Sequence, residues 1–255
     1  MDFQLKEQGE FKYVEEGSGP VILLLHGLFG ALSNFREVIN HFSKNFTVTI
    51  PMLPLYTSEL KDTSVTGMVK FVERFVDWKG YEEVNLIGNS LGGHIALIYS
   101  LRNIQKVKSL ILTGSSGLFE SALGDGYPKK SDYEYVKKKT EYTFYDPNTA
   151  TKELVDEVYD IVNDRRKAIS TLYLAKSAVR HNLREELQNI SCPSLLIWGQ
   201  QDRITPPFVG EEFNKLLPDS KLHFLDNCGH APMMELPEQF NTLVESFLTE
   251  KVYSA

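Results

Sequence analysis

The sequence predicts an α/β protein with a mostly parallel central sheet, helices on both faces of the sheet, and an inserted helical lid. Two patterns indicate this fold class: short apolar runs of strand length alternate with longer segments of helical spacing, and this alternation is interrupted only once. The chain has 255 residues, of which 42% are hydrophobic and 24% charged. This composition excludes a disordered chain, a collagen-like repeat and a coiled coil.

The first half of the chain supplies most of the expected strands. The run Val21–Leu25 is entirely apolar, which is typical of a parallel strand buried on both faces. A helix is indicated by the apolar stripe that begins Val65, Met68, Val69 and Val72. The expected strands here span residues 11–16, 21–25, 47–50, 84–87 and 107–113, and the expected helices span 34–43, 65–78 and 91–101.

The second half returns to the same alternation after the interruption. Strands are expected over residues 194–198 and 221–225, and helices over 208–217 and 237–248. Residues 1–116 and 188–255 would then form the α/β core, and 117–187 an inserted lid of three or four helices. Seven of the twelve tyrosines lie in this insertion, where an even spread would place about three. Either they line a pocket under the lid or they pack the lid on the core.

Charge and cysteine content limit the possible partners. The 27 basic and 34 acidic residues give a net charge of −7, which disfavours binding to nucleic acid. The two cysteines are too few for a disulfide framework. There is neither a secretory signal pattern at the N-terminus nor an apolar run of membrane-spanning length. We therefore expect a cytoplasmic monomer or homodimer with a small-molecule substrate and no membrane partner.

The segment Gly88-Asn89-Ser90-Leu91-Gly92 lies between an expected strand and an expected helix. A Gly-x-Ser-x-Gly sequence in this position matches a nucleophile elbow, a sharp turn that exposes the serine hydroxyl and needs small residues on either side. Ser90 is therefore the candidate nucleophile.

A serine hydroxyl needs a base, and the base needs an acid that fixes its tautomer. His230 follows the last expected strand, in a loop that can reach the mouth of the sheet. Asp202 lies in the loop after the preceding strand, and it is preferred as the acid over Glu120 and Asp226. The order Ser90, Asp202, His230 fits a catalytic triad on this kind of sheet.

The oxyanion formed by attack of the serine needs two N–H donors. Leu91 supplies one, and Leu28, with Phe29 as the alternative, supplies the other from the loop after Val21–Leu25. His26 is expected to hold this loop by hydrogen bonds. Phe29, Asn89 and Ala231 are expected to line the substrate pocket. The chemistry requires no metal and no cofactor.

Together these motifs resemble the α/β-hydrolase superfamily. The resemblance rests on His26-Gly27, the Ser90 turn, Asp202 and the stretch Gly229-His230-Ala231-Pro232, and it extends to Glu235-x-Pro237-Glu238-x-Phe240. It implies the fold named above with a helical lid at about 117–187. Pro51–Ser58 departs from the glycine-rich turn usual in the superfamily, and the resemblance implies that this loop does not touch the triad.

Two groups within the superfamily look closest, and each implies a function. His26–Gly30 with Asn34-Phe35 resembles small carboxylesterases, which implies hydrolysis of a small carboxylic ester through an acyl-enzyme. Gly88–Gly93 and Phe144-Tyr145-Asp146 resemble meta-cleavage-product hydrolases, which cleave carbon–carbon bonds in vinylogous diketones.

The chain departs from the second group at two positions. It has Val158 in place of a lid arginine, and Ala231 in place of a tryptophan after the catalytic histidine. A third reading, from a different class, is a non-catalytic receptor that binds a small ligand in the same pocket.

Overall fold

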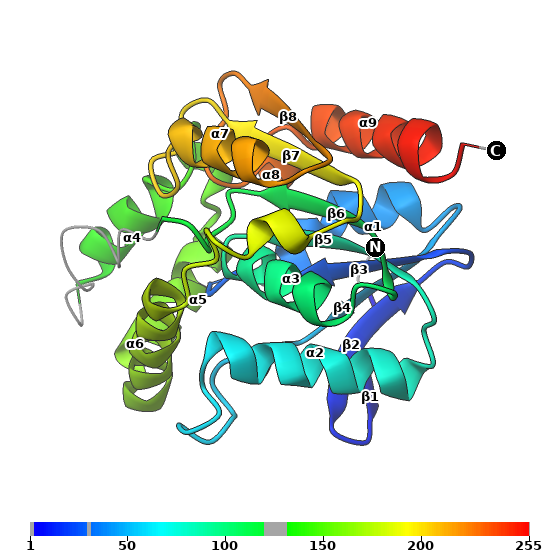
Figure 1. The fold of residues 1–255 in the computed structure, drawn as a ribbon. Coiled ribbons are helices and arrows are strands. Elements are labelled where there is room, and N and C mark those ends of the chain that lie inside the picture. The colour runs from blue at the N-terminus through cyan, green and yellow to red at the C-terminus, as the bar shows by residue number, and fades with distance from the viewer. Residues whose placement is uncertain (1–2, 30–31, 120–131, 255) are drawn as a thin grey trace.

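A mixed sheet of eight strands forms the centre of the computed structural model (Figure 1), which describes residues 3–29, 32–119 and 132–254. The strand order is β1-β2-β4-β3-β5-β6-β7-β8. The strands are β1 (Lys6–Gln8), β2 (Phe11–Glu16), β3 (Val21–Leu25), β4 (Thr47–Pro51), β5 (Val84–Asn89), β6 (Val107–Thr113), β7 (Ser194–Gly199) and β8 (Ser220–Leu225). Strands β3 to β8 run parallel to one another. At one edge of the sheet, β2 pairs antiparallel with β4, and β1 pairs antiparallel with β2. The predicted fold class is confirmed.

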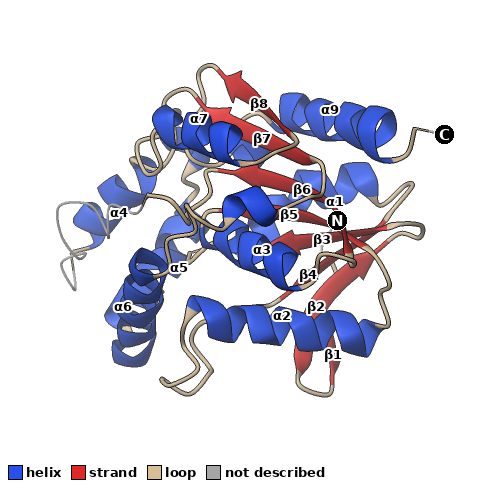
Figure 2. Ribbon diagram, viewed as in Figure 1, coloured by secondary structure: helices blue, strands red, loops and turns tan. Residues whose placement is uncertain are grey.

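Helices cover both faces of the sheet, as Figure 2 shows. They are α1 (Arg36–Phe42), α2 (Val65–Lys79), α3 (Leu91–Arg102), α7 (Pro207–Leu216), α8 (Pro232–Glu235) and α9 (Pro237–Phe247). Alternate residues of β3 serve the two faces: Leu23 and Leu25 pack with α2, α3 and α7, whereas Ile22 and Leu24 pack with α1 and α9. This two-sided burial explains why the strand has no polar position.

An inserted helical region lies between β6 and β7. It contains α4 (Tyr133–Glu141), α5 (Lys152–Asn163) and α6 (Arg165–Arg180), which lie together beside one end of the sheet in Figure 1. The side chains of Asp132, Thr151 and Asp164 accept hydrogen bonds from the first turns of these helices, so each helix starts at an N-cap. The described part of the insertion contains no strand, as predicted. Glu120 and Tyr127 lie outside the described residues.

One strand and one α-helix of the described residues were missed from the sequence. Strand β1 is three polar residues long and lies at the sheet edge, so it has no apolar alternation to reveal it. Helix α8 is a single turn that begins at Pro232, two residues after the candidate base. Within the described ranges, no helix has the length and apolar character needed to cross a membrane.

Candidate active site

Ser90 occupies a strained turn between β5 and α3. Its φ of 55° and ψ of −121° lie in a region that non-glycine residues rarely adopt. The Ser90 N–H donates to the Thr113 carbonyl over 3.2 Å, and the Ser90 carbonyl accepts the N–H groups of His94 and Ser116, each over 3.2 Å. Backbone hydrogen bonds on both sides therefore hold the strained conformation, as a nucleophile elbow requires.

The loop after β3 passes directly over this turn. A Cβ atom on Gly27 would stand 3.2 Å from the Ser90 Cβ and 3.6 Å from its Oγ, so the backbone at Gly27 closely approaches the nucleophile. Leu28 follows at once, and Leu91 is the first residue of α3, where an N–H has no helical partner. The two predicted oxyanion donors thus lie on the two backbone segments that flank Ser90.

His26 holds the loop that carries Leu28 by hydrogen bonds. Its Nε2 accepts the Leu53 N–H over 3.2 Å, so its Nδ1 carries the proton and donates to the Gly27 carbonyl over 2.9 Å. Burial lowers the pKa of His26, which keeps this tautomer neutral. Tyr56 donates its hydroxyl to the Leu28 carbonyl. The resemblance implied that the loop Pro51–Ser58 does not touch the triad. Through Leu53 and Tyr56 this loop contacts the loop that carries Leu28.

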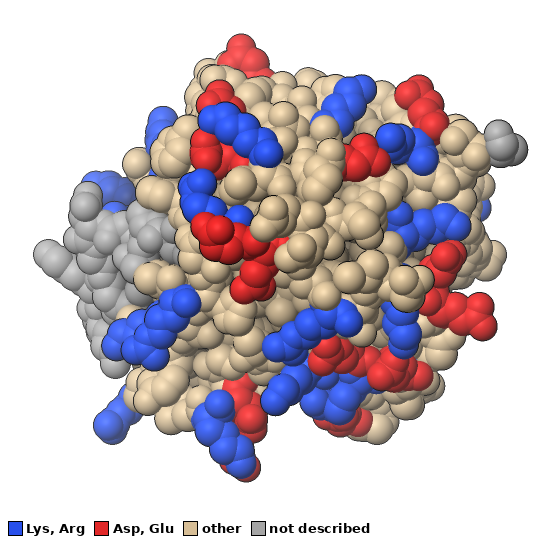
Figure 3. Space-filling view, viewed as in Figure 1, with Lys and Arg blue, Asp and Glu red and all other residues tan. Residues whose placement is uncertain are grey.

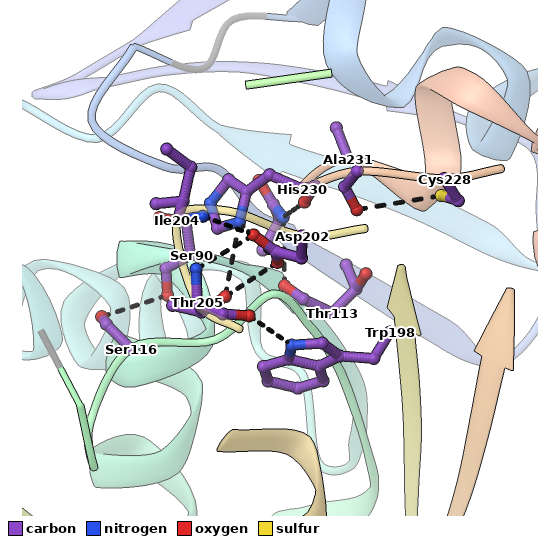
Figure 4. A network of polar contacts seen from close by, with 12 residues as sticks. Ser90, Thr113, Ser116, Trp198, Asp202, Ile204, Thr205, Cys228, His230 and Ala231 are labelled. Atoms are coloured by element: carbon purple, nitrogen blue, oxygen red, sulfur yellow. Dashed lines mark hydrogen bonds and ion pairs between the residues drawn. The ribbon is translucent and has the colours of Figure 1, made fainter. Parts of the chain in front are cut away.

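Asp202 and His230 form a buried pair (Figure 4). The His230 Nδ1 lies 2.9 Å from Asp202 Oδ2, and the Asp202 side chain has 0% exposure. Because a carboxylate only accepts, Nδ1 carries the imidazole proton and Nε2 remains an acceptor. The N–H groups of Ile204 and Thr205 donate to Asp202 Oδ1 over 2.8 and 2.9 Å. The structure brings the predicted acid and base together as the triad requires.

Thr205 is a functional neighbour that the sequence did not reveal. Its hydroxyl donates to Asp202 Oδ2 over 2.9 Å and lies 3.4 Å from His230 Nδ1. Its carbonyl accepts the Trp198 indole N–H over 2.8 Å, which fixes the loop after β7 to the sheet. The signal would have been a hydroxyl residue three positions after the acid, a common pattern for side chains that bond to a nearby loop.

Asn89 connects the Ser90 turn to the His230 loop. Its buried side-chain amide donates to the carbonyls of Thr113 and His230 over 3.0 and 3.1 Å. Asn89 was expected to line the substrate pocket, but its amide is directed into the protein and makes these two bonds. Ser90, Asp202 and His230 lie together in Figure 4. Among the described residues, no hydrogen bond joins the Ser90 hydroxyl to the His230 ring, a contact that often forms only in the complex with substrate.

The other two expected pocket residues flank the site. Phe29 is partly buried and packs at the edge of the core on the α1 and α9 side, and Ala231 is buried and directly precedes α8. The rival acid Asp226 is exposed and accepts the Gln201 side-chain amide over 2.8 Å. The described residues include no group of three or more His, Cys, Asp or Glu side chains arranged to hold a metal ion.

The sequence matches the family described as alpha/beta hydrolase fold over residues 20–140 and 148–237. The chain belongs to this family. A 2-hydroxy-6-oxononadienedioate/2-hydroxy-6-oxononatrienedioate hydrolase of Paraburkholderia phymatum is 31% identical over 92% of this chain and 90% of the relative. Monoacylglycerol lipase ABHD6 of Mus musculus is 27% identical over 91% of this chain and 76% of the relative.

A solved structure is similar over nearly the whole chain. MGS-MChE2, an alpha/beta hydrolase enzyme from a metagenome of lagoon sediments at Mar Chica, Morocco, aligns with a TM-score of 0.81 and 44% identity, covering 97% of this chain and 99% of the other. The protein is thus an α/β-hydrolase family enzyme, and the resemblance inferred from its motifs is confirmed.

Proposed function

We propose that this hydrolase cleaves small-molecule carboxylic esters through an acyl-enzyme on Ser90. The observation that carries the proposal is the buried Asp202–His230 pair, held beside a serine in a strained turn. Together they supply a nucleophile, a base with a fixed tautomer and an acid that orients the base.

The reaction follows from these positions. The Ser90 Oγ attacks the ester carbonyl carbon while its proton passes to His230 Nε2, and the N–H groups of Leu28 and Leu91 stabilise the oxyanion. The tetrahedral intermediate collapses as the alkoxide takes the proton from His230 and leaves as an alcohol. Water then attacks the acyl carbon with His230 as base, and the acid is released. Asp202 stabilises the imidazolium formed in each half of the reaction.

The relative from Paraburkholderia phymatum favours a second candidate, hydrolytic carbon–carbon bond cleavage in a vinylogous diketone, because the substrate in its name belongs to that class. Several side chains support the ester instead. The position of the lid arginine in that group is held by the buried Val158. Arg166, which could replace that arginine in binding a substrate carboxylate, is exposed and donates to the Thr57 carbonyl over 3.2 Å. Bleaching of a coloured ring-fission product by the enzyme would establish the second candidate.

A small molecule remains the partner we propose. Lys and Arg side chains are interspersed with Asp and Glu on the face drawn in Figure 3, a distribution that offers nucleic acid no continuous basic surface on that face.

Replacement of the nucleophile tests the proposed function. Ser90→Ala should lower kcat for short p-nitrophenyl esters on the order of a million-fold, because no acyl-enzyme can form. Ser191→Ala, at an exposed serine outside the site, is the matched control and should keep wild-type turnover. Wild-type turnover in Ser90→Ala would overturn the assignment. Tight ligand binding by the wild-type protein without turnover of any ester would indicate a receptor.

A further inference from the structure

The loop that carries His230 leaves the sheet after β8, so its buried N–H groups need partners outside the strand ladder. Three consecutive groups find them. The Gly229 N–H donates to Glu235 Oε1 over 2.9 Å, the His230 N–H to the Thr143 carbonyl over 3.0 Å, and the Ala231 N–H to Glu235 Oε1 over 3.3 Å. The N–H groups of Gly229 and Ala231, on either side of His230, therefore share one carboxylate oxygen. Glu235 therefore shapes the backbone on both sides of the candidate base.

The second oxygen of Glu235 faces the inserted helical region. The Tyr145 N–H donates to Glu235 Oε2 over 2.7 Å. At the same contact a Cβ atom on Gly229 would stand 2.7 Å from the Thr143 carbonyl oxygen and 2.8 Å from the Tyr145 nitrogen. The segment after α4 and the His230 loop thus meet backbone to backbone, and Glu235 bonds to both.

The surroundings of Glu235 affect the pKa of its side chain. Burial raises its pKa, while the N–H groups of Tyr145, Ala231 and Gly229 favour the carboxylate. The titratable groups that interact with its side chain are Asp202, in the loop after β7, and Cys228, in the loop after β8 that also carries His230. Repulsion from the Asp202 carboxylate also raises the pKa of Glu235.

We propose that Glu235 is a positioning residue, which sets the place of His230 relative to Ser90 and couples that place to the docking of the inserted helices. The proposal rests on the proposed function of His230 as the base. Glu235 touches no reacting atom, and it acts through the backbone of Gly229, Ala231 and Tyr145.

A glutamine in place of Glu235 cannot keep the hydrogen bonds to both the His230 loop and Tyr145. Its single acceptor oxygen can serve the His230 loop or Tyr145, and its NH2 group then opposes an N–H donor on the other side. Glu235→Gln also removes the charge at nearly unchanged volume. Glu235→Asp keeps two acceptor oxygens and the charge but shortens the reach.

The test measures the activation of Ser90 directly with a fluorophosphonate probe. The Ser90 Oγ bonds to phosphorus, fluoride leaves, and the serine proton passes through His230 to water; mass spectrometry locates the adduct. We expect Glu235→Gln to label about tenfold more slowly and to move the midpoint of the pH–rate profile to lower pH. Glu235→Asp should label more slowly with the midpoint near the wild-type value. Glu238→Gln, an exposed carboxylate three residues further along, is the control and should match the wild type.

A purely structural role predicts a different result. Both Glu235 variants would then melt at lower temperature while their folded fractions label at the wild-type rate with the wild-type midpoint, and this outcome overturns the proposal. If Glu235→Gln does not fold, the labelling rate of folded Glu235→Asp decides: a wild-type rate overturns the proposal, and a slower rate supports it. Labelling of wild-type Ser90 without ester hydrolysis would overturn the proposed ester substrate and leave the Glu235 measurement intact. Absence of labelling at Ser90 would overturn both proposals.

Discussion

The Ser90 turn and the His230 loop meet at one site but are held by different means. Ser90 is fixed by backbone contacts between elements that are close-packed: its neighbour Gly92 lies against β3, where a Cβ atom would stand 1.9 Å from the Leu25 carbonyl oxygen. His230 is fixed by carboxylates, with Asp202 on its ring and Glu235 on the N–H groups of the adjacent residues.

This difference separates the effects expected from mutation. A turn fixed by packed backbone has no spare volume, so a change there acts on the fold itself. A loop held by side chains can lose one partner while the surrounding sheet and helices persist. Damage to the turn should appear as lost stability, and damage to the loop as lost activity.

The largest expected effect on stability is at the turn. Gly92→Ala places a methyl group against the Leu25 backbone, which cannot yield as a flexible side chain would, so we expect a loss of at least about 3 kcal/mol in the free energy of unfolding. Gly80→Ala is the matched control. Gly80 has a φ of 68° but nothing within 4 Å of a Cβ, so only about 1 kcal/mol of backbone strain is expected. Urea unfolding measures both, and equal losses would contradict the contrast.

At the His230 loop, the expected effect of a substitution is a loss of activity. Asp202→Asn should lower kcat for an ester about 10,000-fold, because the amide no longer fixes the His230 tautomer that leaves Nε2 as an acceptor. The asparagine oxygen can still accept the N–H groups of Ile204 and Thr205, so the variant should fold. Asp226→Asn, at the exposed rival acid, should leave kcat unchanged. Comparable losses in the two variants would show that the acid has been wrongly assigned.

The contrast also explains what the sequence could predict. The Ser90 turn leaves a local signature, because the steric demand is met by glycines within two residues of the serine. The strand β3 and the helix α3 were also predictable from local sequence, because each is buried so thoroughly that its composition reveals it. The fold and the order of Ser90, Asp202 and His230 could be predicted from such local patterns.

The supports of the loop left no such signature. Glu235 resembled the ordinary start of a final helix, and Tyr56 lay in a stretch notable only for its missing glycines. Each acts on backbone groups distant in the chain, and a contact of this kind depends on how loops cross in space. Asn89 shows the same limit, since adjacency to the nucleophile suggested the pocket while its amide bonds to Thr113 and His230.

The smallest expected effect is the pH dependence of stability that arises from His94, close to the Ser90 turn. His94, on the first helical turn after Ser90, is buried; its Nε2 donates to the His181 carbonyl over 2.8 Å, and its Nδ1 lies 3.4 Å from the Ser116 hydroxyl. Burial lowers the pKa of His94 to about 4 from its ordinary value of 6.5. Between these pH values the unfolded chain binds a proton that the folded protein does not, so stability is complete above pH 6.5 and falls as the pH drops toward 4.

The expected slope from this group is about 1 kcal/mol for each pH unit in that window. His94→Gln can keep a donor for the His181 carbonyl but does not titrate, so its free energy of unfolding should fall less steeply than that of the wild type between pH 6.5 and 4.5. Urea unfolding at matched pH values isolates the difference, since all other acidic groups are shared. Parallel slopes of the free energy of unfolding against pH would mean that His94 binds its proton in the folded protein. Protonation beside the Ser90 turn would then occur without unfolding.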